Sequence, residues 1–247
     1  MPRAISAAVA FLSLVISHAA IGACSGTLYL TVDTGSMSQA DLIAAALNKH
    51  QVKATFFIAN EKTVRGDYSL DDSWGDYWRA RVKEGHAFGS HTWRHWHLRR
   101  DVKNDHIFYL SMDGKEHELL DRKAFCEELQ RPAVAFEKMT GRKLDALWRA
   151  PGGRLTAHAL KWGAGCGFSR HVAWSDAGFL GDELPSEQFP NDMLLKRALA
   201  KIKDGDILVM HLGIWSRKDP FAPMLDPLLA GLKNKGFCFA TLAATQP

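Results

Sequence analysis

Short apolar runs alternate with amphipathic stretches along most of the chain. The apolar runs predict seven strands, at 27–33, 54–59, 86–91, 146–150, 170–176, 206–212 and 237–242. Between them, apolar positions recur at helical spacing and predict six helices, at 38–50, 74–84, 122–140, 155–164, 192–203 and 223–235. This regular alternation is typical of a parallel α/β fold.

Individual residues refine these predictions. Ser38 and Asp41 form a capping-box-like start to the first helix. Pro132 lacks a backbone N–H, so it predicts a kink in the helix at 122–140 or a late start to it. The segment 97–122 (HLRRDVKNDHIFYLSMDGKEHELLDR) fits neither the strand nor the helix period, and we expect it to be an insertion over the mouth of the fold.

An open doubly wound sheet is the competing architecture. The glycine-rich turn G-x-G-x-x-G after the first strand marks the dinucleotide-binding form of that fold. Here the first strand ends in Val32-Asp33-Thr34-Gly35, which does not match. The sequence therefore favours a barrel. With 247 residues, 47% of them hydrophobic, the chain is long enough for one large domain.

The first 23 residues have the features of a secretory signal peptide. Arg3 supplies a positive charge, residues 4–16 are apolar apart from serines, and small residues lead to position 24. The stretch Ile21-Gly22-Ala23-Cys24 also resembles the lipobox of bacterial lipoproteins. Cleavage near this point leaves Cys24 either lipidated, as a membrane anchor, or free to form a disulfide. We expect a periplasmic, extracellular or lipid-anchored protein.

Cysteine spacing and net charge argue against a zinc finger and against a nucleic-acid partner. Export permits disulfides, and Cys24, Cys126, Cys166 and Cys238 allow three full pairings. None of the four has zinc-finger spacing, so we expect structural roles. The formal net charge of +4 is too small to indicate a nucleic-acid partner.

Ionisable residues collect where the predicted strands end. In parallel barrels the C-terminal strand ends form the functional face. In chain order, these ends carry Asp33, then His91 and His95, then Arg149, then Trp174 and Asp176, and finally His211. A single such residue would be unremarkable, but five successive strand ends indicate a functional site.

The residue types at these strand ends suggest metal-assisted acid–base chemistry. His91 and His95 are the candidate metal ligands, because imidazole nitrogen suits zinc and its neighbours, and a helical turn or a tight loop brings residues at this spacing together. Asp33 is a natural general base for a water beside the ion. Arg149 would hold that carboxylate ionised and oriented, and His211 would protonate a leaving amine.

In this order, the residues resemble the polysaccharide deacetylases, the NodB-homology domain of carbohydrate esterase family 4. The resemblance extends from Thr27 to Leu242 and rests on Thr31-Val32-Asp33-Thr34-Gly35, Ala54-Thr55-Phe56-Phe57, His91-Thr92-Trp93-Arg94-His95, Arg149-Ala150-Pro151-Gly152-Gly153, Trp174-Ser175-Asp176 and Leu208-Val209-Met210-His211. It implies a distorted (β/α)7 barrel over 24–247. It also implies a metal-dependent hydrolase that removes N-acetyl groups from chitin-like, peptidoglycan or poly-N-acetylglucosamine chains.

The resemblance also implies the role of each residue. Asp33 becomes the base, Arg149 orients it, His91 and His95 hold the metal, and His211 is the acid. Two further implications concern the partner of His211, which is expected to be Asp176, and the oxyanion donor. The backbone N–H that follows Pro151 is the candidate donor, and Pro151 and Gly152 are candidate substrate contacts.

Two positions depart from the family pattern. The usual strand motif has two successive aspartates, the second of which binds metal, but the second position here is Thr34. The fourth motif is compressed around Asp176, with Asp182 downstream, so the partner of His211 is open between them. The carboxylate that completes the metal site is equally open among Asp33, Asp176 and Asp182.

Tryptophans and the residue at position 34 bear on substrate contact and on the alternative functions. Eight tryptophans are many for this length, and we expect most to be core residues, with Trp96 and Trp215 as the candidates for sugar contact. Thr34 favours an inactive carbohydrate-binding barrel as the alternative to an enzyme. The same residues would also serve an O-acetyl esterase or the hydrolysis of a formamide.

Overall fold

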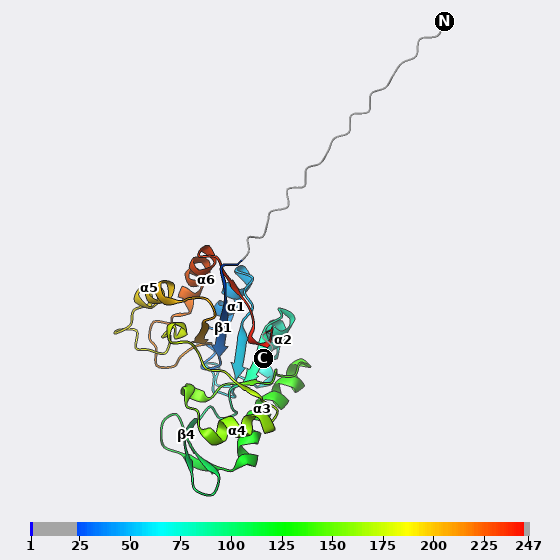
Figure 1. Ribbon diagram of the computed structural model, residues 1–247, viewed down its shortest axis with the longest axis vertical. Coiled ribbons are helices and arrows are strands. Elements are labelled where there is room, and N and C mark those ends of the chain that lie inside the picture. The colour runs from blue at the N-terminus through cyan, green and yellow to red at the C-terminus, as the bar shows by residue number, and fades with distance from the viewer. Residues whose placement is uncertain (2–23, 245–247) are drawn as a thin grey trace.

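A curled sheet of seven parallel strands forms the centre of the molecule in the computed structural model, which describes residue 1 and residues 24–244 (Figure 1). The strands are β1 (Gly26–Asp33), β2 (Thr55–Ile58), β3 (Ala87–Ser90), β7 (Leu147–Trp148), β8 (Arg170–His171), β9 (Ile207–His211) and β10 (Phe237–Phe239). Their order is β10-β1-β2-β3-β7-β8, and β9 also pairs with β1. An isolated parallel bridge between Phe179 and Val209 brings the segment after β8 against β9. The predicted single-domain distorted barrel is confirmed.

The strand β1 is the centre of this sheet. Leu28, Leu30 and Val32 are completely buried in the main core, as their alternation predicts. β1 pairs with β10 at its start and with β2 at its end, while β9 runs beside Tyr29–Asp33. The position of Asp33 at the end of this strand is therefore fixed by two neighbouring strands.

Two strands are much shorter than predicted, at 146–150 and 170–176. β7 and β8 contain two residues each. The carbonyl groups of Val172 and Ala173 accept hydrogen bonds from the Arg149 side chain instead of from a neighbouring strand. Two backbone carbonyls directly after β8 therefore hold a site residue.

Within the described residues, six α-helices surround the sheet: α1 (Ala40–Lys49), α2 (Gly75–Lys83), α3 (Arg122–Thr140), α4 (Ala157–Gly165), α5 (Asn191–Lys201) and α6 (Leu225–Asn234). Asp121 caps α3 by accepting a hydrogen bond from the Ala124 N–H at 2.8 Å, and α3 continues through Pro132 to Gly141, whose φ is 74°. The predicted late start of this helix is wrong, because its N-cap fixes the beginning at residue 122.

The segment 97–122 contains a three-stranded antiparallel sheet that the sequence pattern did not predict. It consists of β4 (His97–Val102), β5 (His106–Leu110) and β6 (His117–Leu120). Leu98, Ile107, Tyr109 and Leu120 are buried on its inner face, in a second core cluster with residues of α3 and α4. A register shift between Leu98 and Arg100 breaks the alternation, so β4 has no clear period-two signal. Figure 1 shows β4 on the side of the molecule toward which β1 ends.

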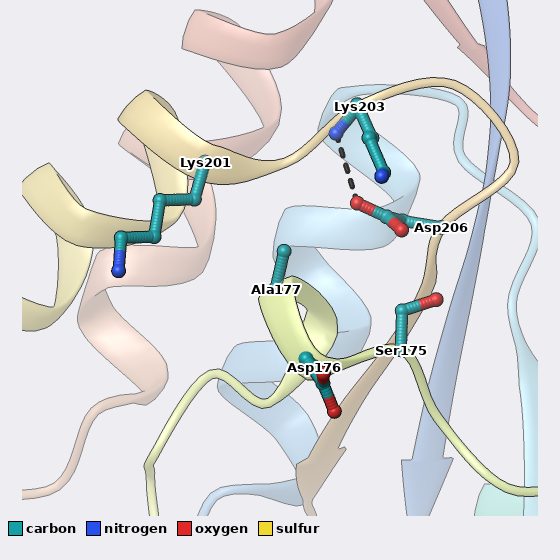
Figure 2. A pocket seen from close by; sticks show the side chains of 6 residues that line it. All are labelled: Ser175, Asp176, Ala177, Lys201, Lys203 and Asp206. Carbon is teal, nitrogen blue, oxygen red and sulfur yellow. Dashed lines mark hydrogen bonds between the residues drawn. The ribbon is translucent and has the colours of Figure 1, made fainter.

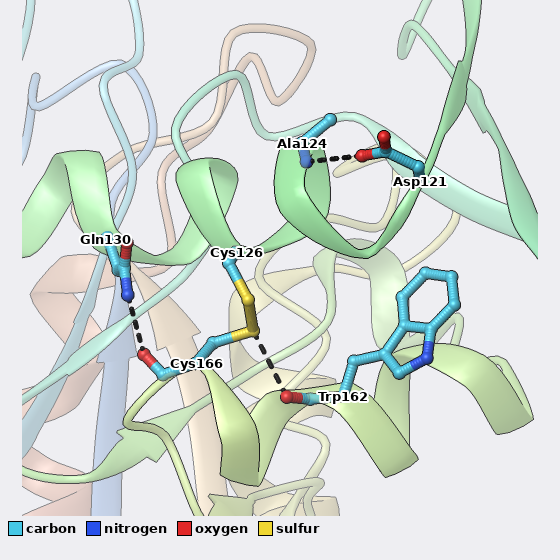
Figure 3. The surroundings of a disulfide bond; sticks show 6 residues. All are labelled: Asp121, Ala124, Cys126, Gln130, Trp162 and Cys166. Carbon is cyan, nitrogen blue, oxygen red and sulfur yellow. Dashed lines mark hydrogen bonds between the residues drawn. A yellow bond between two sulfur atoms is a disulfide. The ribbon is translucent and has the colours of Figure 1, made fainter.

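Two disulfides join elements that are distant in sequence. Cys126 in α3 is bonded to Cys166 at the end of α4, where Gln130 also donates a hydrogen bond to the Cys166 carbonyl (Figure 3). Cys24, just before β1, is bonded to Cys238 in β10. Over residues 24–244, no helix combines the length and apolarity that crossing a bilayer requires.

Candidate active site

The register of the sheet brings the predicted strand-end residues to one level. Asp33 lies opposite His211 in β9 and opposite Phe57 in β2, and Ser90 lies opposite Trp148. His91 and Arg149 each follow these paired positions by one residue. Side chains far apart in sequence therefore meet at the C-terminal end of the sheet.

Asp33 and Arg149 form a buried ion pair at this end. The Arg149 Nη1 lies 2.6 Å from the Asp33 Oδ1 and also donates to Thr31 at 2.9 Å. The guanidinium is completely buried, and its other nitrogens donate to the carbonyls of Val172 and Ala173. Burial alone would raise the pKa of Asp33, but the charges of Arg149 and His211 lower it below its ordinary value. Asp33 is therefore ionised at neutral pH.

His211 is paired with Asp182. The Asp182 carboxylate accepts a hydrogen bond from the His211 backbone N–H at 2.7 Å and lies 3.2 Å from its Nδ1. Burial would lower the pKa of His211, but the carboxylates of Asp182, Asp33 and Glu183 outweigh it and raise that pKa to about 10. The ring is therefore protonated at neutral pH, and Nε2 is its remaining donor.

The prediction that Asp176 partners His211 is wrong. The N–H of the preceding Ser175 donates to the carbonyl of Ile207, at the start of β9, whereas His211 ends that strand. Four residues of strand separate the two levels by about 13 Å. Figure 2 shows Asp176 at a different cavity, which is lined by Ser175, Asp176, Ala177, Lys201, Lys203 and Asp206.

His91 and His95 meet through a tight loop rather than a helical turn. Thr92 and His95 have positive φ angles of 63° and 55°, which fold the loop back on itself. The two Nε2 atoms lie 3.1 Å apart, and the Asp33 Oδ2 lies 3.4 Å from the His91 Nε2. The His91 Nδ1 faces the Arg149 carbonyl at 3.0 Å. Because burial lowers the pKa of His91 to about 3, this ring is neutral.

These donors fit a transition-metal ion. A carbonyl oxygen only accepts hydrogen bonds, so the neutral His91 carries its proton on Nδ1 and presents the Nε2 lone pair to His95. Metal-ligating histidines usually have this arrangement, with the second ring nitrogen donating to an acceptor. Within residues 24–244, no group of three or more His, Cys, Asp or Glu side chains is clustered closely enough to form a complete metal cage. The fit is therefore that of two imidazoles with one adjacent carboxylate, Asp33.

The Thr34 side chain is hydrogen-bonded to Glu61. The Thr34 hydroxyl accepts a hydrogen bond from the Ala59 N–H at 3.1 Å and donates to the Glu61 Oε2 at 2.6 Å. The other carboxylate oxygen of Glu61 lies 3.2 Å from the His95 Nδ1. A carboxylate thus lies behind His95, although the sequence prediction did not include Glu61. Its place just after the strand predicted at 54–59 is the signal that would have found it.

A small cavity adjoins Asp33, His95 and His211. It is lined by Asp33, His95, Met112, Gly152, Trp174, Phe179, Glu183, Val209 and His211. Met112 comes from the turn between β5 and β6, so the inserted sheet contributes to the wall. The sequence prediction missed Met112, Phe179 and Glu183, because no strand end carries them and only the tertiary fold brings them here.

The other predicted contact residues differ in position. Trp215 is 64% exposed in the loop that follows β9. Trp96 is packed against Tyr109, with the Arg94 guanidinium 4.5 Å from its ring, so it belongs largely to the second core. Pro151 is buried, whereas Gly152 lines the cavity with φ of 60°.

The sequence profile that describes the polysaccharide deacetylases matches residues 22–170. The chain belongs to the polysaccharide deacetylase family. The predicted resemblance is confirmed, and with it the enzyme class, because this is a family of hydrolases that act on carbon–nitrogen bonds other than peptide bonds.

Relatives of this polysaccharide deacetylase are similar over most of the chain. A peptidoglycan-N-acetylglucosamine deacetylase of Bacillus cereus is 26% identical over 86% of this chain and 66% of its own length. PgdA of Listeria monocytogenes, with the same activity in its name, is 23% identical over 86% of this chain but only 37% of its own length.

Solved structures share the fold at low sequence identity. A family 4 carbohydrate esterase from Streptomyces lividans has a TM-score of 0.65 at 21% identity, covering 90% of this chain and 96% of that chain. A family 4 pseudoenzyme from Bacillus anthracis has a TM-score of 0.65 at 20% identity, covering 89% of this chain and 64% of that chain. Both likenesses support the fold alone.

Proposed function

We propose that the protein is an exported, metal-dependent deacetylase that hydrolyses N-acetyl groups on an amino-sugar polysaccharide. The observation that carries this proposal is the pair of opposite charges around one cavity: ionised Asp33 held by Arg149, and protonated His211 held by Asp182. Amide hydrolysis requires a base for the water and an acid for the nitrogen. A sugar-binding barrel requires neither.

Each residue has a defined part in this reaction. Asp33 takes a proton from the water that adds to the acetyl carbon, and His211 gives its Nε2 proton to the nitrogen as the C–N bond breaks. Acetate and a free amine are released. The Gly152 N–H is the proposed oxyanion donor. His91 and His95 would hold the ion, for which Zn²⁺ is the first choice; when bound, it polarises the acetyl carbonyl and makes a nearby water more acidic.

The substrate and location follow from the relatives and the cysteines. Relatives named for peptidoglycan N-acetylglucosamine support a cell-wall polymer, and the exposed Trp215 offers an aromatic face to a sugar. Two disulfides support an oxidising compartment outside the cytoplasm. Because the Cys24 sulfur is bonded to Cys238, it has no valence left for a lipid, which supports the unlipidated alternative.

Acetate release tests this proposal against its alternatives. Purified protein with added Zn²⁺ should release acetate from N-acetylated oligomers or peptidoglycan. In His211→Ala the rate of release should be lower by a factor on the order of 10²–10⁴. Release from acetylated xylan alone would indicate an esterase. Release from no substrate would favour the inactive barrel, which the replacement of the usual metal-binding aspartate by Thr34 supports.

A further inference from the structure

Glu61 connects the unusual Thr34 to a metal-ligand candidate. One of its carboxylate oxygens accepts the Thr34 hydroxyl proton at 2.6 Å, and the other lies 3.2 Å from the His95 Nδ1. The Glu61 side chain is 20% exposed and the His95 side chain 15% exposed, so both groups are largely shielded from water. A carboxylate in this position is an acceptor for a proton on Nδ1.

The backbone around Glu61 is anchored on both sides. Its N–H donates to the Ser69 hydroxyl at 3.0 Å, and its carbonyl accepts from the Ser69 N–H at 2.8 Å. The neighbouring Asn60 N–H donates to the Trp93 carbonyl, inside the loop that carries both histidines. These bonds fix the distance between Glu61 and that loop, so the contact with His95 does not depend on a free side chain alone.

The orientation of His95 matters because of what its other nitrogen faces. The His91 Nδ1 lies 3.0 Å from the Arg149 carbonyl, which can only accept, so Nδ1 carries the ring proton and the lone pair is on Nε2. The His95 Nε2 lies 3.1 Å from that atom. A cation between the two rings requires lone pairs on both Nε2 atoms, and a proton on the His95 Nε2 would block it.

We propose that Glu61, held by Thr34, is a positioning residue that keeps the His95 proton on Nδ1 and so directs the Nε2 lone pair toward the metal. This inference rests on the proposed metal-dependent function. Thr34, at the usual aspartate position, then has a structural role: it holds the Glu61 carboxylate next to the His95 ring. A Thr34→Asp substitution would set two carboxylates against each other, so it should not tighten metal binding while Glu61 is present.

Zinc titration of the metal-free protein by calorimetry tests this role. Glu61→Leu removes the acceptor at similar size, and Thr34→Val removes only the hydroxyl that holds it. Loss of such a supporting group costs about 10- to 100-fold in metal affinity, and we expect Glu61→Leu to fall in that range, with Thr34→Val weaker in effect. Thr34→Ser keeps the hydroxyl and should bind as the wild type does. Glu127→Leu, at a 58% exposed side chain on α3, is the matched control.

The tautomer of His95 is the second readout, and activity does not enter it. In ¹⁵N spectra of the metal-free proteins, the Nδ1-protonated form of His95 should have a larger population in the wild type than in Glu61→Leu, because the His91 Nε2 lone pair competes with Glu61 for the same proton. In Glu61→Leu the Nε2-protonated form should gain population. Unchanged zinc affinity in folded Glu61→Leu, or the same tautomer in both proteins, would overturn the proposal. A wild type that binds no zinc would overturn the metal-dependent function instead, and the tautomer comparison would still decide the role of Glu61.

Discussion

Two buried carboxylates, Asp33 and Asp182, keep two neighbours in their charged forms. Asp33 balances the fully buried Arg149, and Asp182 balances His211 through both its backbone and its ring. The result is a base that is ionised and an acid that is protonated at the same pH. Neither state would persist in these buried positions without its partner.

We expect the Asp182 carboxylate to set the alkaline limit of the proposed deacetylase activity. The acid form of His211 is lost as the pH rises through its pKa, which is about 10. Asp182→Asn removes the strongest influence that raises this pKa, so the alkaline limb of the kcat profile should move to lower pH. Glu183→Gln, whose carboxylate lies 3.9 Å from the His211 Nε2, should move it less. An alkaline limb that is unchanged in Asp182→Asn would show that His211 is not the acid.

The Asp33–Arg149 pair also predicts a cost in stability. Asp33→Asn leaves the Arg149 charge buried without its counter-ion, and breaking such a pair costs about 3–5 kcal/mol. The free energy of unfolding, measured by urea titration, should fall by that amount. Glu118→Gln removes the 51% exposed partner of Arg94 and should cost no more than about 1 kcal/mol. Equal losses in the two variants would contradict the buried pairing.

Individual residues show how far the sequence could predict this site. Asp33, His91, Arg149 and His211 were found because each follows a strand end in the motif order. Asp176 failed as the partner of His211, since motif spacing does not reveal that the chain runs parallel to β9 after Ser175 and reaches the level of His211 only at Asp182. Glu61 also lies just after a predicted strand, but its contact with His95 depends on the conformation of the loop that carries both histidines, which that position alone does not reveal.

At the scale of elements, strands were predicted well where they are buried in the centre and poorly where they end at the site. β1 matches its predicted segment closely, because its alternation reflects real burial. Directly after β8, two backbone carbonyls bind the Arg149 side chain, a tertiary contact that the sequence pattern does not show. The inserted sheet was missed because a register shift between Leu98 and Arg100 interrupts the period-two alternation in β4.

The bond between α3 and α4 predicts a stability effect without a catalytic one. Cys126 and Cys166 are separated by 40 residues and lie in the second core, outside the cavity lining. Replacing both by alanine should lower the free energy of unfolding by about 2–4 kcal/mol, because the unfolded chain gains freedom. Urea titration measures this loss. A large fall in zinc affinity of the folded variant would show that α3 and α4 also position the site.

At the scale of the whole molecule, the barrel is assembled from both ends of the chain. β1 and β10 are neighbours in the sheet, and the bond between Cys24 and Cys238 closes a loop with a sequence separation of 214 residues. Asp33, at the other end of β1, therefore depends on a strand whose beginning is covalently tied to the last strand. The charged side chains of the site lie close together, but the strands that position them come from nearly the whole described chain.

The Cys24–Cys238 bond should contribute more to stability than the Cys126–Cys166 bond. Loop-closure entropy rises with 1.5R times the logarithm of loop length, so the 214-residue loop should stabilise the fold by about 1.5 kcal/mol more than the 40-residue loop. Cys24→Ala/Cys238→Ala should therefore lose more unfolding free energy in urea than Cys126→Ala/Cys166→Ala.

Intact-mass measurement of the exported protein should show two disulfides, a first residue near position 24 and no added lipid. A lipid on Cys24 would rule out this bond in the cell, and with it the larger stability loss, because one sulfur cannot carry both.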